Sequence, residues 1–188
     1  MITIIYAHPW DGSFNNAVLK ETKKTLEQNN QEYTVIDLNK DGFNPVLTEN
    51  ELSVYGKSGF KDPLVDKYIQ ILKKTEKIIF AFPIWWLGAP AILKGFFDKV
   101  YLKDKVISFE NSEVTKVTKA LLLTTSEFTT DTLINEVNDP IQVVEYPIKS
   151  MGVKDISWHN LGNIILSKES ERLDYLDKVS GFVEELLK

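Results

Sequence analysis

The chain has 188 residues, with 22 Lys and Arg against 27 Asp and Glu, a net charge of −5, and no Cys. This length suits one domain spanning residues 1–188, and a content of 43% hydrophobic and 26% charged residues excludes a disordered or collagen-like chain. The lack of Cys excludes thiolate catalysis, thiolate metal sites and a disulfide framework. The acidic balance argues against binding to nucleic acid, which requires a clustered basic surface.

The most apolar segment, residues 78–93, is interrupted by Pro83, Gly88 and Pro90. It is shorter than the roughly 20 apolar residues that a membrane-spanning helix needs. The first six residues lack the charged start and long apolar middle of a signal peptide. We therefore expect a cytoplasmic protein with no membrane insertion.

Strand and helix patterns alternate along the chain. Short runs rich in β-branched and apolar residues predict five strands at Ile2–Ala7, Tyr33–Leu38, Lys77–Phe82, Ala120–Thr125 and, with its continuation, Val153–Trp158. Apolar residues at helical spacing predict helices at Asn15–Gln28, Asp62–Lys74, Ala91–Tyr101 and Glu169–Leu187. This alternation predicts an α/β fold with a doubly wound five-stranded parallel sheet in the order 2-1-3-4-5.

One connection, Asn39–Lys61, is unusually long and contains Gly42, Pro45, Gly56 and Gly59. We expect it to hold a short helix. Long loops in compact domains are commonly functional, so a lid or a subunit contact and a merely tolerated insertion are both open.

Ligands of doubly wound sheets bind outside the carboxyl ends of the strands, which selects the loops after the first, third and fourth strands. The first loop leads from His8 to Asn15 and then into a helix. Ser13 or Asn15 can cap that helix, whose free N–H groups form an anion site. The loop matches neither GxGxxG nor GxxxxGK[ST], and an ordinary capped turn remains the alternative.

The second loop follows Phe82 and contains the adjacent pair Trp85 and Trp86. Neighbouring residues at the end of a strand cannot both face the core, so at least one indole lines a cleft, an interface or solvent. A flat aromatic ligand and a dimer interface would each use such a surface. The third loop begins with Thr124 and Thr125, whose hydroxyl groups are a weak signal alone.

Together these loops resemble the NAD(P)H:quinone oxidoreductase family, which has a flavodoxin-like fold and includes ancillary oxidoreductases of potassium efflux systems. The resemblance rests on His8-Pro9, on Ser13-Phe14-Asn15 and on the long block Phe82–Tyr101, and it covers about residues 2–125. It implies a flavin-binding domain with non-covalent FMN, or alternatively FAD, and with NADH or NADPH as co-substrate.

The resemblance also implies the cofactor-binding residues. The expected set is His8, Ser13, Phe14, Asn15, Pro83, Ile84, Trp85, Trp86, Leu87, Thr124, Thr125, Ser126 and Glu127. In this set the first loop holds the phosphates, and Pro83–Leu87 contacts the isoalloxazine ring.

One departure from the family concerns the third loop, where two glycines usually follow the paired threonines. Ser126 and Glu127 stand there in this chain. A side chain at Glu127 would crowd the ring or place a negative charge beside it, and either effect opposes reduction. The Tyr and His that assist hydride transfer in better-known members have no counterpart in Phe128–Asn138, so no catalytic residue is assigned.

The remaining histidine, His159, is expected at the surface, and two His without Cys do not predict a metal site. The implied activity is two-electron hydride transfer from NAD(P)H through flavin to a quinone or similar small acceptor. A homodimer is implied as well. A flavodoxin-type electron carrier and a regulatory flavin-binding subunit docked on a transporter are the alternatives, because one fold serves all three.

Overall fold

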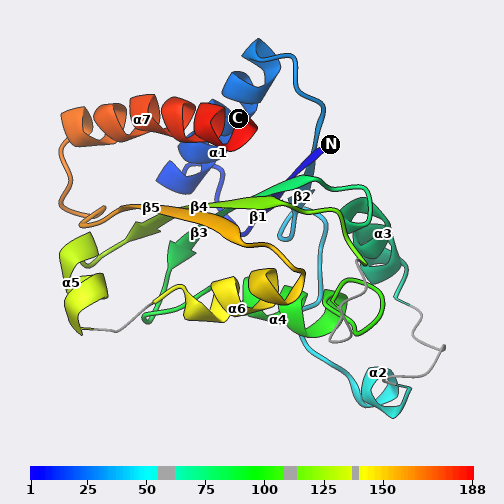
Figure 1. Cartoon of the computed structure of the whole chain (residues 1–188). Coiled ribbons are helices and arrows are strands. Elements are labelled where there is room, and N and C mark those ends of the chain that lie inside the picture. The colour runs from blue at the N-terminus through cyan, green and yellow to red at the C-terminus, as the bar shows by residue number, and fades with distance from the viewer. Residues whose placement is uncertain (55–61, 108–113, 137–139) are drawn as a thin grey trace.

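Five parallel strands form one sheet between two layers of helices in the computed structural model (Figure 1). The structure describes residues 1–54, 62–107, 114–136 and 140–188. The strands are β1 (Ile2–Tyr6), β2 (Tyr33–Asp37), β3 (Lys77–Ile84), β4 (Lys119–Ser126) and β5 (Asp155–Leu161). The helices are α1 (Phe14–Gln28), α2 (Glu49–Ser53), α3 (Pro63–Leu72), α4 (Ala91–Val100), α5 (Thr130–Glu136), α6 (Gln142–Ser150) and α7 (Glu169–Leu187). The sheet order is β2-β1-β3-β4-β5, which confirms the predicted topology.

Both faces of the sheet are buried because successive side chains of each strand point to opposite sides. On one face Ile4 and Leu121 pack against α1 and α7, and on the other Ile5 and Phe80 pack against α3, α4 and α6 (Figure 1). The near-continuous apolar runs of the central strands are therefore required by two cores rather than one. This explains why they do not alternate with polar residues.

The predicted elements are present with shifted ends. β3 continues two residues beyond Phe82, and Pro83 pairs in register with Thr125 of β4. β4 likewise extends to Ser126. The sequence did not predict α5, which buries only Leu133, or α6, which contains Pro147. Short helices with so few buried positions give no clear periodic pattern.

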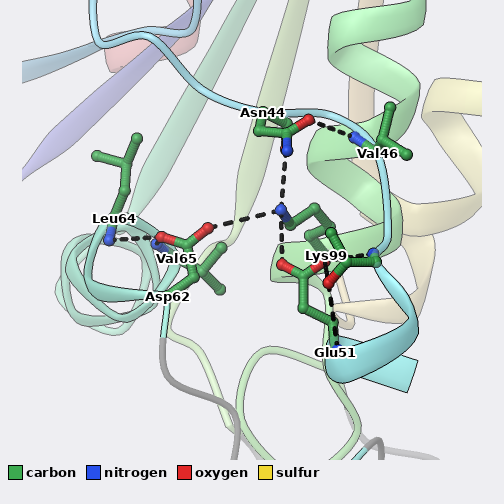
Figure 2. A network of polar contacts seen from close by, with 8 residues as sticks. Asn44, Val46, Glu51, Asp62, Leu64, Val65 and Lys99 are labelled. Carbon is green, nitrogen blue, oxygen red and sulfur yellow. Dashed lines mark hydrogen bonds and ion pairs between the residues drawn. The ribbon is translucent and has the colours of Figure 1, made fainter. Parts of the chain in front are cut away.

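The described part of the Asn39–Lys61 connection is anchored to the domain through a buried lysine (Figure 2). Lys99 of α4 is 1% exposed, and its Nζ lies 2.8 Å from Glu51 Oε1 and 3.5 Å from Asp62 Oδ2. The same ammonium donates to the carbonyl oxygen of Asn44 at 2.9 Å. Its three donors thus have three acceptors, from the connection, from α2 and from the start of α3.

Both carboxylates of this network also cap helices. Asp62 accepts from Leu64 N at 2.9 Å at the start of α3, and Glu51 closes a capping box with Thr48 at the start of α2. Burial acts to raise the pKa of Glu51, but hydrogen bonds from Lys99 and Thr48 outweigh it and hold this pKa below its ordinary value. The short helix expected in the connection is confirmed as α2, whereas residues 55–61 lie outside the described residues.

One glycine lets the connection approach α4 closely. A Cβ atom at Gly95 would lie 2.3 Å from the carbonyl oxygen of Pro45, nearer than real Cβ contacts. Gly95 and Lys99 are one helical turn apart, so they share a face of α4. This face holds the connection by close backbone packing at one position and by charge at the next.

His159 differs from its expected surface position. It is half-buried on β5, and its ring stacks on Phe182 of α7 with centroids 3.4 Å apart and planes 4° from parallel. Burial lowers the pKa of His159. Nothing in the sequence indicates this stacking, because Phe182 lies 23 residues after His159 and on a different element.

Candidate functional site

A cavity of about 720 Å³ opens at the carboxyl ends of β1, β3 and β4, at the edge where the switch-point rule places ligands. Its walls come from the three loops singled out by the sequence and from the segment after β5. The lining residues are His8, Trp10, Ser13, Phe14, Asn15, Pro83, Ile84, Trp85, Trp86, Leu87, Thr125, Ser126, Glu127, Phe128, Ile164 and Ile165. Twelve of the thirteen residues predicted from the family resemblance therefore surround one space.

The N-terminus of α1 forms one wall. Ser13 has extended backbone angles and accepts from Asn16 N at 3.1 Å, the geometry of an N-cap. The first N–H groups of any helix have no partner within it, and the dipole of a 15-residue helix adds a partial positive charge there. This wall suits a phosphate or another anion.

His8 stands beside this wall in a defined tautomer. Its Nδ1 accepts from the backbone N–H of Trp10 at 3.1 Å, and its ring meets Trp85 edge-on at 5.7 Å. Burial lowers the pKa of His8, so the ring is neutral near pH 7. With Nδ1 occupied as an acceptor, the proton of the neutral ring is on Nε2, which can donate to a ligand.

The second wall is a tight turn that closes on itself. Trp85 N donates to Gly88 O at 3.0 Å, and Gly88 N donates to Trp85 O at 3.1 Å. The two residues between them, Trp86 and Leu87, have φ of 48° and 61°, a region that side chains other than Gly rarely adopt. The reciprocal hydrogen bonds hold this strained backbone, which directs the Trp86 indole fully into solvent at the cavity mouth.

The third wall shows that the paired threonines divide their roles. Thr125 accepts from Asn15 Nδ2 at 2.8 Å and joins β4 to α1 beneath the cavity. Thr124 does not line the cavity, since its hydroxyl is hydrogen-bonded to side chains of β5 instead. It is 1% exposed, accepts from Trp158 Nε1 at 2.8 Å and donates to Asn160 Oδ1 at 2.8 Å.

Four lining residues were not predicted: Trp10, Phe128, Ile164 and Ile165. The last two follow β5 and are held over the site because Ile164 N donates to Ser126 O at 2.9 Å. Applying the carboxyl-end rule to the fifth strand would have found this segment. Trp10 lies within the predicted first loop, but nothing in its spacing separates it from the neighbouring loop residues.

The donors and acceptors of this site fit a flavin. One buried oxygen, Oδ1 of Asn15, has no hydrogen-bond partner, whereas Nδ2 of the same amide is satisfied. Leaving a buried acceptor unpaired costs about 1–3 kcal/mol, so this atom favours a ligand that carries a donor. An anion wall, a donor at His8, a free acceptor at Asn15 and flat aromatic walls match the phosphate, polyol and ring of such a cofactor.

Among the described residues no cluster of three or more His, Cys, Asp or Glu could hold a metal ion. Over the same part of the chain, no helix has the length and apolar character needed to cross a bilayer.

Comparisons with known proteins agree with this architecture. An uncharacterized NAD(P)H oxidoreductase of Haemophilus influenzae is 32% identical over 111 residues, which are 58% of this chain and 54% of that protein. An FMN-dependent NADH:quinone oxidoreductase of Mycoplasma mycoides is 29% identical over 101 residues, 54% of this chain and 48% of that protein. The chain spans about half the length of the curated relatives it matches.

The fold itself is matched over nearly the whole chain. The solved NAD(P)H:quinone oxidoreductase of Methanothermobacter marburgensis superposes with a TM-score of 0.84 and 23% identity, covering 98% of this chain and 94% of that one. The sequence family described as having a flavodoxin-like fold (Flavodoxin_2) matches residues 1–179. The predicted family resemblance is thereby confirmed, and the chain belongs to this flavodoxin-like family.

Proposed function

We propose that this protein is a flavin-dependent NAD(P)H oxidoreductase that holds FMN and passes two electrons to a quinone-like acceptor. The observation that carries the proposal is the single cavity that gathers twelve residues of the family motif from three separate loops. The names of the relatives from Haemophilus and Mycoplasma support an NAD(P)H-linked activity, and that of the Mycoplasma protein supports FMN. The chain as a whole would act as one flavin-binding domain.

In this proposal each wall has a separate task. The N–H groups at the start of α1 and the Ser13 hydroxyl bind the phosphate, and His8 Nε2 donates to a neighbouring oxygen. Asn15 Oδ1 accepts from the cofactor, and this contact satisfies an atom that is otherwise buried without a partner. When bound, flavin supplies the chemistry by accepting a hydride from NAD(P)H and giving two electrons to the acceptor.

The aromatic turn orients the flat ligands. Trp85, Trp86 and Leu87 form an apolar wall against which a ring can lie, and excluding water there strengthens the polar contacts deeper in the site. Trp86, Leu87 and Ile165 leave apolar surface exposed at the mouth. We therefore propose that a second copy of the chain covers this mouth in a homodimer with two-fold symmetry.

The test is the visible spectrum of the purified protein after incubation with FMN or FAD and desalting, followed by anaerobic NADH or NADPH. We expect retained FMN that either nicotinamide bleaches. An Asn15→Leu variant should retain less flavin, since it removes the free acceptor. Asn135→Leu is the matched control, because Asn135 is exposed on α5 and does not line the cavity.

Two results would contradict the proposal. If the wild-type protein retains neither flavin, the cavity serves another ligand. If flavin is retained but neither nicotinamide reduces it, the protein is not an NAD(P)H oxidoreductase, and the carrier alternative replaces it. Light scattering of the loaded protein tests the homodimer, which a monomeric mass would exclude.

A further inference from the structure

The side chains that line the described cavity carry formal charge of one sign only, which is negative. Among its described lining residues only His8 and Glu127 are ionisable, and none is Lys or Arg. His8 is the neutral member of this pair, since its burial disfavours the imidazolium form. Near pH 7 the lining of the described cavity therefore carries one formal charge, the Glu127 carboxylate.

Hydrogen bonds on both neighbours fix the backbone that carries this carboxylate. Ser126 Oγ donates to Phe128 O at 2.7 Å and accepts from Asn160 Nδ2 at 2.8 Å. Ile164 N donates to Ser126 O at 2.9 Å, and Asn163 N donates to Phe128 O at 3.1 Å. The chain on either side of Glu127 is thus held against the segment that follows β5.

The Glu127 side chain is exposed, and within the described part of the chain no cation pairs with it. Its charge is not neutralised locally, unlike those of Glu51 and Asp62, which share Lys99. Leu87 and Phe128, which line the same cavity, are apolar and offer this carboxylate no counter-charge. An anion entering the mouth would be repelled by Glu127, and no Lys or Arg lines the described cavity to offset it; in the proposed function the partial positive charge at the start of α1 is already taken by the cofactor phosphate.

We propose that Glu127 is a specificity-determining residue that selects neutral or cationic quinone-like acceptors against anionic acceptors of the same shape. The inference rests on the proposed function for the idea that a flat acceptor occupies this cavity. Two unit charges a few ångströms apart at an exposed position interact only weakly, because solvent screens them. The expected discrimination is therefore about three- to tenfold.

The test compares two ligands of the same shape, naphthoquinone and its monosulfonate, in equilibrium binding to FMN-loaded protein without reductant. Quenching of Trp fluorescence gives a dissociation constant for each, and the measured quantity is the ratio of the sulfonate constant to the neutral one. The lack of Cys removes thiol addition to the quinone as a complication. The charge on the bound cofactor is the same in every variant, so it does not affect the comparison of their ratios.

We expect the ratio to fall about three- to tenfold in Glu127→Gln and further in Glu127→Lys. For wild-type protein the ratio should also decrease in about 1 M salt, because charges are screened beyond a Debye length of about 3 Å. Asp131→Asn is the control, since it removes an exposed carboxylate from the nearby α5 without touching the cavity lining. The ratio should not change in this variant.

An unchanged ratio in both Glu127 variants would overturn the proposal, as would an equal change in Asp131→Asn. Failure of the proposed function would be visible separately, as absence of retained flavin or of reduction by NAD(P)H. In that event the same titration on the protein without flavin still reports whether Glu127 discriminates by charge.

Discussion

Replacing Lys99 with Met tests whether the buried ammonium holds the long connection to α4. The substitution keeps the length of the side chain but removes a charge that is 1% exposed and satisfied by three acceptors. Removing one partner of a buried ion pair costs about 3–5 kcal/mol. Glu51 and Asp62 retain some contact with water and keep their capping hydrogen bonds. We therefore expect the free energy of unfolding to fall by about 2–3 kcal/mol, less than for a fully buried pair.

The assay is urea unfolding of Lys99→Met beside wild type, with the melting temperature as a second measure. In a chain of this size 1 kcal/mol corresponds to about 2–4 °C, so the melting temperature should fall by about 5–10 °C. Adding Glu51→Gln should restore part of the loss, because it removes one of the two carboxylates left without a cation.

Lys94→Met is the matched control on the same helix. Lys94 pairs with Asp98 at the surface, and such exposed pairs contribute about 0–0.5 kcal/mol. If Lys99→Met costs less than about 1 kcal/mol, or no more than Lys94→Met, the network does not anchor the connection and the reasoning from burial is wrong.

Three further predictions concern other parts of the fold. Gly95→Ala should destabilise the protein by about 1–3 kcal/mol despite better helix propensity, because the new Cβ meets the backbone of Pro45, whereas Gly181→Ala, with nothing within 4 Å, should stabilise it by about 0.5–1 kcal/mol in the same denaturation assay. Trp86→Gly should raise the free energy of unfolding by up to about 1 kcal/mol, because glycine relieves the strain of the positive φ. The same variant should bind flat aromatic ligands more weakly in a fluorescence titration. A loss of stability together with the loss of affinity would contradict the argument from strain. Burial lowers the pKa of His159 in the folded state, whereas in the unfolded chain this pKa has the ordinary histidine value of about 6.5. As the pH falls through about 6.5, the unfolded chain therefore takes up a proton that the folded protein does not, and the free energy of unfolding decreases. The melting temperature of His159→Phe should fall less between about pH 8 and pH 5 than that of wild type, and parallel curves would exclude this contribution.

The sheet could be predicted from the sequence because each central strand satisfies two cores at once. A run such as Ile78–Phe82 has no polar face, and only a strand covered on both sides needs that composition. α5 and α6 were not predicted because they lack a periodic apolar pattern: each buries at most two side chains, and α6 contains Pro147. Their positions are set by packing against the finished sheet rather than by their own pattern.

The candidate site was predictable to the extent that it follows from strand ends. The loops after β1, β3 and β4 converge because parallel strands end at one edge, and this brings Asn15 within hydrogen-bond distance of Thr125. The lysine network could not be predicted, because Lys99 meets Glu51 and Asp62 only after three elements have docked.

At Trp86 the backbone belongs to the fold, whereas the exposed indole at the cavity mouth is available to a ligand. Its backbone is set by the hydrogen bonds between Trp85 and Gly88, and its side chain is fully exposed, so the hydrophobic core places no demand on its identity. Within the folded domain, substitution at Trp86 is constrained chiefly by tolerance of a left-handed backbone. If the cavity binds a flat ligand as proposed, evolution or a mutant library confined to Trp86 would alter ligand contacts at the mouth without changing the hydrophobic core.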